Sequence, residues 1–113
     1  MLAGNFIDDG RRLWLIDWDY AGFNCPLFDL ANLASNNDFP EKLEQELLEK
    51  YFEQTISADL WKCYFAMKCA SLLREAMWSM VSEIHSTLNF DYVKYTTDNL
   101  ERFENTFAQF EKL

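Results

Sequence analysis

The sequence predicts a mostly helical α+β domain with a β-hairpin at its N-terminus. The chain has 113 residues, of which 50% are hydrophobic and 17% are aromatic, a composition typical of one folded domain. A turn signal of two aspartates and a glycine at residues 8–10 lies between two short apolar segments, as in a β-hairpin. After Pro26, apolar residues recur at three- and four-residue steps, which predicts helices for the rest of the chain.

We expect the hairpin to span residues 5–19. Its first arm is residues 5–7, and its second arm contains the apolar run 13–16. Because all residues of this run are apolar, we expect the second strand to be covered on both faces.

The first two helices are expected at residues 27–36 and 41–54. A cluster of Asn, Asp and Pro at residues 36–40 separates them and ends the first helix. In the second helix, leucines and aromatic residues repeat at helical spacing with glutamates between them, so we expect an amphipathic helix with a solvated acidic face. The glutamates of that face are Glu41, Glu44, Glu46, Glu49 and Glu53.

The third helix is expected to be the central one. Ser57 can cap its N-terminus, and apolar side chains spread around much of its circumference until about Ser86. We expect His85, the single histidine, to lie at the end of this helix without a partner that would make it a base. The last helix is expected to follow residues 88–90, with aromatic residues at three- and four-residue steps.

The net charge, the lack of a membrane-spanning or targeting segment, and the spacing of the cysteines argue against several functions for this sequence, among them nucleic-acid binding. Ten Lys and Arg residues against nineteen Asp and Glu residues give a net charge of −9, so the field of the protein would repel nucleic acid. No apolar run approaches the ~20 residues that cross a bilayer, and the N-terminus has no basic segment, so we expect a cytoplasmic protein without a membrane span. Cys25, Cys63 and Cys69 lack the spacing of a zinc site, and we expect reduced thiols.

Two oxygen-bearing side chains stand at the two arms of the expected hairpin. Asn5 lies on one arm and Asp17 at the end of the other, so the hairpin could bring them together in space. Hard cations such as Mg²⁺ prefer oxygen ligands of this kind. Both residue types are also favoured in turns and caps, so the pair by itself leaves metal binding open.

Two segments at the N-terminal end resemble the choline/ethanolamine kinase family. They are residues 5–22 and residues 26–31, and the wider aminoglycoside phosphotransferase-like group, with its protein-kinase-like fold, is similar here. In those enzymes a catalytic loop with His-x-Asp and an Asn is followed by a hairpin and by an Ile-Asp-[Phe/Trp]-[Glu/Asp] motif. This sequence has Ile-Asp-Trp-Asp at residues 16–19.

The resemblance implies a nucleotide-bound metal site. Asn5 matches the loop Asn of the family, Asp17 matches its metal-binding Asp, and Asp19 matches the acidic residue two positions later. It implies that Asn5 and Asp17 hold Mg²⁺ on the phosphates of ATP. Asp29 matches a family Asp at the start of a helix, where we expect it to act as an N-terminal cap or as a partner of the helix dipole.

A second match lies about 60 residues further along the chain. Residues 77–81 and 89–95 resemble the choline kinase segment that supplies aromatic walls to the substrate pocket. A quaternary ammonium group neither donates nor accepts hydrogen bonds and is held by aromatic faces. Aromatic residues at helical spacing are also typical of a core, so each ring taken alone has both interpretations. The residues implied to bind substrate are Asp19, Tyr20, Trp78, Phe90, Tyr92 and Tyr95.

One position departs from the family pattern. The family often has a second Trp three residues before the one matched by Trp78, and this chain has Glu75 there. The carboxylate could face the cation, pair with Arg74 or point to solvent. The sequence leaves these three possibilities open.

The resemblance as a whole implies the helical C-lobe of a kinase-like phosphotransferase, one domain over residues 1–113. Residues 1–20 would form the end of the catalytic loop and the metal-binding hairpin, and residues 27–113 the helical substrate-binding part. The implied reaction is ATP-dependent phosphorylation of a small alcohol such as choline or ethanolamine. The alternatives are another small-molecule kinase of the group, acting on thiamine, an aminoglycoside or a sugar, and a noncatalytic helical binding module.

The family pattern also places essential parts outside this sequence. Its catalytic-base Asp would precede residues 2–5, and its nucleotide-holding lobe would come earlier still. We therefore expect no catalytic residue in this chain and no kinase activity from it alone. The surface that faces that lobe in the family would be exposed, which favours a homodimer.

Overall fold

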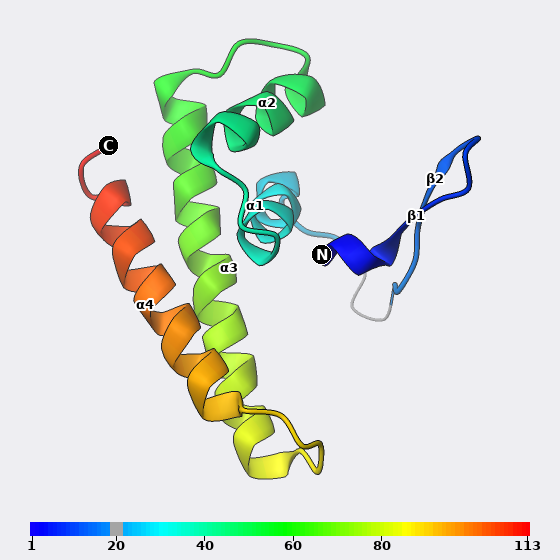
Figure 1. Ribbon diagram of the computed structural model, residues 1–113. Helices are drawn as coiled ribbons and strands as arrows, with labels where there is room; N and C mark the ends of the chain where they lie inside the picture. Colours follow the sequence, from blue (N-terminus) through cyan, green and yellow to red (C-terminus); the bar gives the residue numbers. More distant parts are fainter. Residues whose placement is uncertain (19–21) are drawn as a thin grey trace.

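The computed structural model describes residues 1–18 and 22–113, in which a β-hairpin is followed by four helices (Figure 1). A short 3₁₀ turn, Ala3–Asn5, precedes the hairpin. The strands are β1 (Phe6–Asp8) and β2 (Leu13–Leu15), and the helices are α1 (Pro26–Asn36), α2 (Glu41–Phe52), α3 (Ala58–His85) and α4 (Tyr92–Phe110). The predicted mostly helical fold with an N-terminal hairpin is confirmed.

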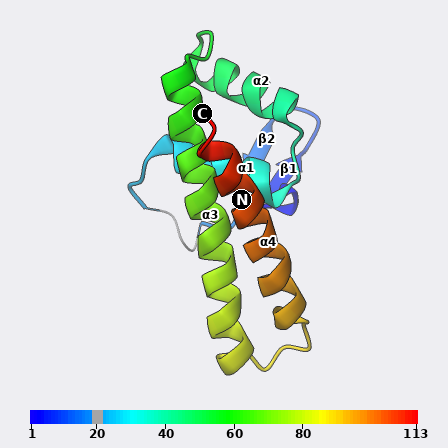
Figure 2. The ribbon, with the colours of Figure 1, turned by 90° about the vertical axis from the view of Figure 1, so that its left-hand side faces the viewer.

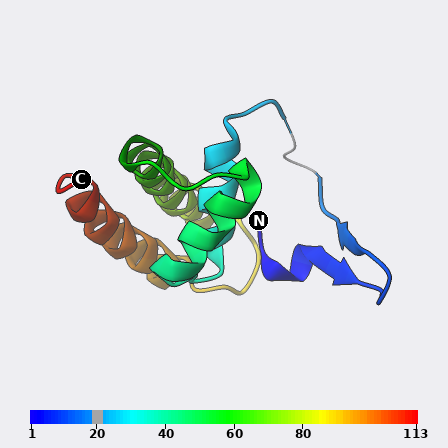
Figure 3. The same cartoon turned by 90° about the horizontal axis from the view of Figure 1, so that it is seen from above.

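The long helix α3 is the centre of the domain. Helix α4 returns along it after the loop at the foot of Figure 1, and both views in Figures 1 and 2 show the two helices side by side. Helix α1 packs on another part of α3, and α2 contacts α1. The hairpin extends away from the helices, as the view from above shows (Figure 3). Among the described residues, none of the helices has the length and apolarity needed to cross a membrane.

Local signals begin and end the helices close to the predicted positions, with one difference at the end of α2. The Oγ of Ser57 accepts a hydrogen bond of 3.1 Å from the backbone N–H of Leu60, so the predicted cap of α3 is confirmed. Asp91 caps α4 in the same way through the backbone N–H of Lys94. Helix α2 ends two residues earlier than predicted because Glu53 takes a left-handed conformation, with φ of 53°.

The hydrophobic core lies between α1, α2 and the first half of α3. Small residues of α1, such as Ala31 and Ala34, have no exposed surface, which lets the helices approach closely. Burial of large apolar side chains against them supplies the main favourable term in folding. The buried core residues are Leu27, Leu30, Ala31, Ala34, Leu48, Tyr64 and Phe65.

The prediction that the second strand is covered on both faces is wrong for the described residues. Strand β2 pairs only with β1, with Leu15 opposite Phe6 and Trp14 opposite Ile7. Leu13 is 65% exposed and Trp14 is 47% exposed, because β1 is the only described element that makes extensive contacts with β2. A run of apolar residues indicates a strand but does not provide the neighbours that would bury it.

The predicted acidic face of α2 needs one correction. Glu44 is 1% exposed, and its carboxylate accepts a hydrogen bond of 2.6 Å from the Nζ of Lys68 on α3. The same Nζ lies 5.4 Å from the centre of the Phe65 ring. Glu44 shares a helical face with the buried Leu48, so it turns toward α3 and needs a charged partner there. Of the other four glutamates, Glu46 is half-buried and three are exposed.

We predict that Lys68→Met destabilises the domain by about 3 kcal/mol, because it leaves the Glu44 carboxylate buried without its partner. The free energy of unfolding is measured by urea denaturation followed by circular dichroism. Lys42→Met, which removes an exposed lysine from α2, is the matched control and should change the free energy by less than about 0.5 kcal/mol. Equal stabilities of the Lys68 variant and the control would contradict the prediction.

Candidate functional site

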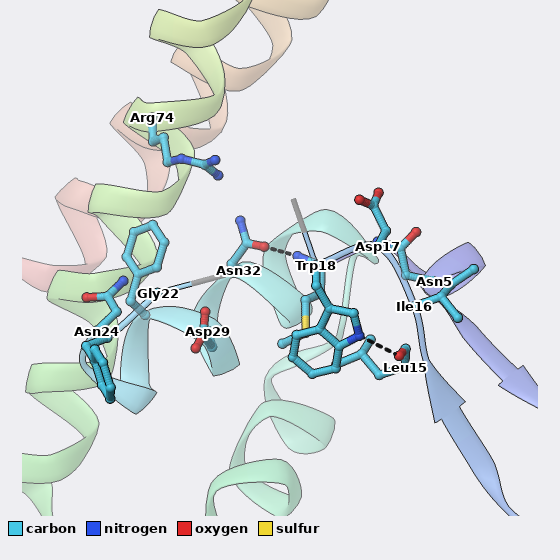
Figure 4. Close-up of a pocket in the computed structure, with 13 residues that line it drawn as sticks. Asn5, Leu15, Ile16, Asp17, Trp18, Gly22, Asn24, Asp29, Asn32 and Arg74 are labelled. Atoms are coloured by element: carbon cyan, nitrogen blue, oxygen red, sulfur yellow. Dashed lines mark hydrogen bonds between the residues drawn. The ribbon is translucent and has the colours of Figure 1, made fainter. Parts of the chain in front are cut away.

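A pocket of about 620 Å³ lies between the end of the hairpin, the first half of α1 and the middle of α3 (Figure 4). We call it the hairpin pocket. It is open on one side, and its lining combines apolar side chains with several polar ones. The polar side chains are Asn5, Asp17, Asn24, Asp29, Asn32 and Arg74.

Asn5 and Asp17 stand together on one wall of the hairpin pocket. The carbonyl of Asn5 accepts a hydrogen bond of 2.9 Å from the backbone N–H of Ile16, which holds the two arms together next to Asp17. Asp17 has a φ of 66°, which is a left-handed backbone conformation. This conformation is unfavourable for residues other than glycine, and among these Asp and Asn adopt it most readily. Figure 4 shows the two side chains beside each other. The hairpin thus brings together the two residues that the sequence predicts as metal ligands.

The chemistry of this pair fits Mg²⁺ that is shared with phosphate groups. Mg²⁺ keeps several waters and is usually bound by one or two carboxylates together with substrate phosphates. Asn5 and Asp17 offer one amide oxygen and one carboxylate. Among residues 1–18 and 22–113, no three His, Cys, Asp or Glu side chains gather as a larger metal site would require. The pair can therefore supply part of a coordination sphere, with phosphate oxygens and water as the rest.

Helix α1 forms the opposite wall, and here the predicted role of Asp29 is corrected in part. The residue before the helix is Cys25, which makes no capping hydrogen bond through its side chain. Asp29 lies in the first turn and does not cap it, so only its predicted role as a partner of the helix dipole fits the structure. Its carboxylate lines the pocket across from Asp17.

Three polar residues of the pocket, Asn24, Asn32 and Arg74, were not predicted as site residues from the sequence. Asn32 is buried and donates a hydrogen bond of 3.0 Å to the Oγ of Ser71 on α3. It also accepts a hydrogen bond from the amino group of Met1. Arg74 extends from α3 into the pocket (Figure 4). The one sequence signal for any of them is that Asn32 interrupts the apolar series of α1.

The aromatic side chains that the sequence predicts at the substrate site form one cluster, which we call the aromatic cluster. It consists of Trp78 on α3, Phe90 in the loop, and Tyr92 and Tyr95 in the first turn of α4. The Phe90 ring lies 4.9 Å from that of Tyr92 and 5.7 Å from that of Tyr95. The Trp78 ring lies 6.1 Å and 6.4 Å from the same two tyrosines. Trp78 therefore meets Tyr92 and Tyr95 in space, although these tyrosines follow it by 14 and 17 residues in the sequence.

The aromatic cluster is neither wholly core nor wholly surface. Tyr92 is 8% exposed, whereas Trp78 is 48% exposed and Phe90 is 53% exposed. The hydroxyl of Ser79 donates a hydrogen bond of 2.9 Å to the carbonyl of Tyr92, and the hydroxyl of Tyr92 donates one of 2.9 Å to the Oγ of Ser86. The buried tyrosine is fixed by these bonds, and the two half-exposed rings offer faces to a ligand.

Glu75 lies where the cluster approaches the hairpin pocket. Its side chain is 14% exposed, and its Oε1 accepts a hydrogen bond of 3.1 Å from Arg74. Its Oε2 accepts a hydrogen bond of 3.3 Å from the hydroxyl of Tyr95. Of the three possibilities in the sequence, pairing with Arg74 is therefore observed and pointing to solvent is wrong. Because Arg74 lines the pocket while Glu75 contacts the cluster, these two consecutive residues connect the sites.

The sequence also led to predictions for three further residues, Asp19, Tyr20 and His85. Asp19 and Tyr20 lie outside the residues that the structure describes. His85 is the last residue of α3, as predicted, and its side chain is exposed. The predicted metal and substrate roles of the other site residues stay predictions, although the geometry brings those residues together.

Carboxylates shape the electrostatics where the two sites meet. Burial lowers the pKa of the Met1 amino group at the pocket wall, while the negative charges of Glu75 and Asp29 act to raise it. Burial raises the pKa of the Tyr95 hydroxyl, and the Glu75 carboxylate raises it further. The charge of Glu75 therefore acts both in the hairpin pocket and in the aromatic cluster.

Comparison with known proteins gives consistent matches along the chain. A protein named LicA from Haemophilus influenzae is 30% identical over 119 residues, covering 100% of this chain and 42% of that protein. A probable ethanolamine kinase from Arabidopsis thaliana is 27% identical over 114 residues, covering 84% of this chain and 30% of that protein. No protein-family profile matches the sequence.

The fold has a solved counterpart. The crystal structure of a choline/ethanolamine kinase family protein from Mesorhizobium loti matches with a TM-score of 0.84 and 27% identity, covering 93% of this chain and 36% of that chain. The predicted resemblance to this family, and the predicted kinase-like helical lobe, are confirmed. The chain spans less than half the length of each of these relatives.

We predict that Glu75→Gln lowers the pKa of Tyr95, because a neighbouring negative charge opposes formation of the phenolate and the substitution removes that charge. The measurement is the ultraviolet absorbance of tyrosinate during an alkaline titration, with Tyr95→Phe used to assign the signal. Glu83→Gln removes an exposed carboxylate two turns further along α3 and should leave the titration of Tyr95 unchanged. Superimposable curves for the wild type and Glu75→Gln would show that the Glu75 charge does not act on Tyr95.

Proposed function

We propose that this chain, which has the sequence pattern and the fold of the C-terminal lobe of the choline/ethanolamine kinase family, binds the alcohol substrate in an ATP-dependent small-molecule kinase. The observation that carries the proposal is the arrangement of two sites side by side. Four aromatic rings and the Glu75 carboxylate meet where α3, α4 and the loop between them come together. The adjacent Arg74 reaches into the pocket that contains Asn5 and Asp17.

The aromatic cluster is the proposed site for the ammonium end of choline or ethanolamine. Each aromatic face that meets a cation contributes about 0.5–2 kcal/mol, and the half-exposed rings of Trp78 and Phe90 are accessible to one. The net charge of −9 adds a long-range attraction for cations. Asp19 and Tyr20 remain proposed members of the substrate site on the basis of the sequence match alone.

Asn5 and Asp17 are the proposed protein ligands of Mg²⁺ on the nucleotide phosphates. When bound, the metal would neutralise charge on the transferred phosphoryl group. The chain's own contribution is positional: the hairpin fixes both oxygens on one wall, and the aromatic cluster orients the substrate. We therefore assign metal binding to residues 1–20 and substrate binding to residues 27–113.

We propose that the 113-residue chain alone does not transfer phosphate. The resemblance assigns the catalytic base and the nucleotide lobe to sequence that precedes these 113 residues in the family. A homodimer is a further part of the proposal, because it would bury the apolar side chains that the hairpin exposes, among them Leu13, Trp14 and Ile16. A cytoplasmic location stays a prediction.

The substrate proposal predicts that choline or ethanolamine binds saturably to the chain and that Trp78→Ala weakens this binding by about tenfold. Isothermal titration calorimetry is the measurement, because the substitution would remove a fluorescent reporter. Trp14→Ala is the matched control, since Trp14 on the hairpin is 47% exposed against 48% for Trp78. An aminoglycoside that binds while both small alcohols do not would favour another kinase of the group.

The metal proposal predicts that Asp17→Asn weakens binding of Mn²⁺, a paramagnetic substitute for Mg²⁺. Asn tolerates the left-handed backbone at residue 17, so the variant removes the charge and keeps the fold. The measurement is paramagnetic broadening of the amide signals of residues 5 and 17 in NMR spectra. Asp8→Asn, at the end of strand β1 in the same hairpin, is the control and should keep the broadening. Equal broadening in wild type and Asp17→Asn would argue against this site.

A further inference from the structure

We propose that Glu75 determines which ammonium alcohol the site prefers, and that it favours a primary ammonium group over a quaternary one. This inference rests on the proposed function, because it concerns the substrate of the same site. It assigns a role to the one position at which the sequence departs from the aromatic pattern of the family.

The geometry places the Glu75 carboxylate at the wall of the aromatic cluster. Glu75 and Trp78 are three residues apart on α3 and therefore share a face of the helix. Across from them, the Tyr95 hydroxyl donates to Glu75 and the Tyr95 ring lies 6.4 Å from that of Trp78. A cation against the rings of Trp78 and Tyr95 would therefore lie close to a negative charge.

The carboxylate retains hydrogen-bonding capacity for a ligand. An ionised carboxylate has about four lone-pair positions, and two partners, Arg74 and Tyr95, occupy one on each oxygen of Glu75. These two bonds hold the side chain in place, which reduces the entropy lost when a ligand binds. Since the side chain is only 14% exposed, a new charged hydrogen bond there would compete with little water.

Primary and quaternary ammonium groups differ in the interactions that they can make with the Glu75 carboxylate and the aromatic rings. A primary ammonium carries three N–H donors and can donate to Glu75, whereas a quaternary ammonium has none and gains only the charge attraction and the aromatic faces. An aromatic residue at position 75 would offer a further π-face and no acceptor. The carboxylate therefore attracts both cations and gives the additional hydrogen bond to the primary one alone.

The test is calorimetric binding of ethanolamine and choline to the 113-residue chain at matched ionic strength. We expect Glu75→Gln to weaken ethanolamine binding by about tenfold and choline binding by about threefold or less. Glutamine keeps the size of the side chain and can still accept from Tyr95, so the fold should persist, which circular dichroism checks. The matched control is Glu83→Gln, which removes the same charge from an exposed position of α3 and should leave both affinities unchanged.

The ratio of the two affinities separates the possible outcomes. A fall in the ethanolamine-to-choline affinity ratio in Glu75→Gln alone supports the proposal. If the wild type binds both ligands and the ratio is unchanged, Glu75 does not select the substrate, and the proposed substrate site still stands. If the wild type binds neither ligand, the proposed function fails for this chain and this inference fails with it.

Discussion

Two buried serines on α3 hold the helices in the register on which both sites depend. Ser71 and Ser79 have no exposed surface, and their small side chains let the neighbouring helices approach α3 closely. Ser71 accepts a hydrogen bond from Asn32 of α1, and Ser79 donates one to the carbonyl of Tyr92 in α4. Because Arg74, Glu75 and Trp78 lie between these two serines, the same contacts determine where the site residues point.

A further contact connects α4 to the end of α1. Arg102 of α4 donates a hydrogen bond of 2.9 Å to the carboxylate of Asp38 and another to the backbone carbonyl of Ser35. It thereby satisfies a carbonyl at the C-terminal end of α1, where no helical partner is available. The polar contacts made by Ser71, Ser79 and Arg102 therefore act together with the apolar core to define how α1, α3 and α4 are arranged around the site.

Much of the fold could be predicted because its signals are local. The turn at residues 8–10, the cap at Ser57 and the helical spacing of apolar residues each act over a few neighbouring residues, and the structure has the hairpin and the helices accordingly. Burial was predicted less well because it depends on distant partners. The exposed faces of β2 and the burial of Glu44 beside Lys68 are both decided by which elements pack together.

The sequence by itself determined the types of element, their order, and the identity of the residues that match the kinase family. It could not decide how the site residues are joined, because Asn5 and Asp17 meet through strand pairing, and Trp78 and Tyr95 meet through the packing of α4 on α3. The position of Glu75 between Arg74 and Tyr95 was likewise open until the helices were in place. The sequence specifies which side chains are present. Contacts between residues far apart in sequence form only when the whole fold compensates the conformational entropy that is lost in bringing them together.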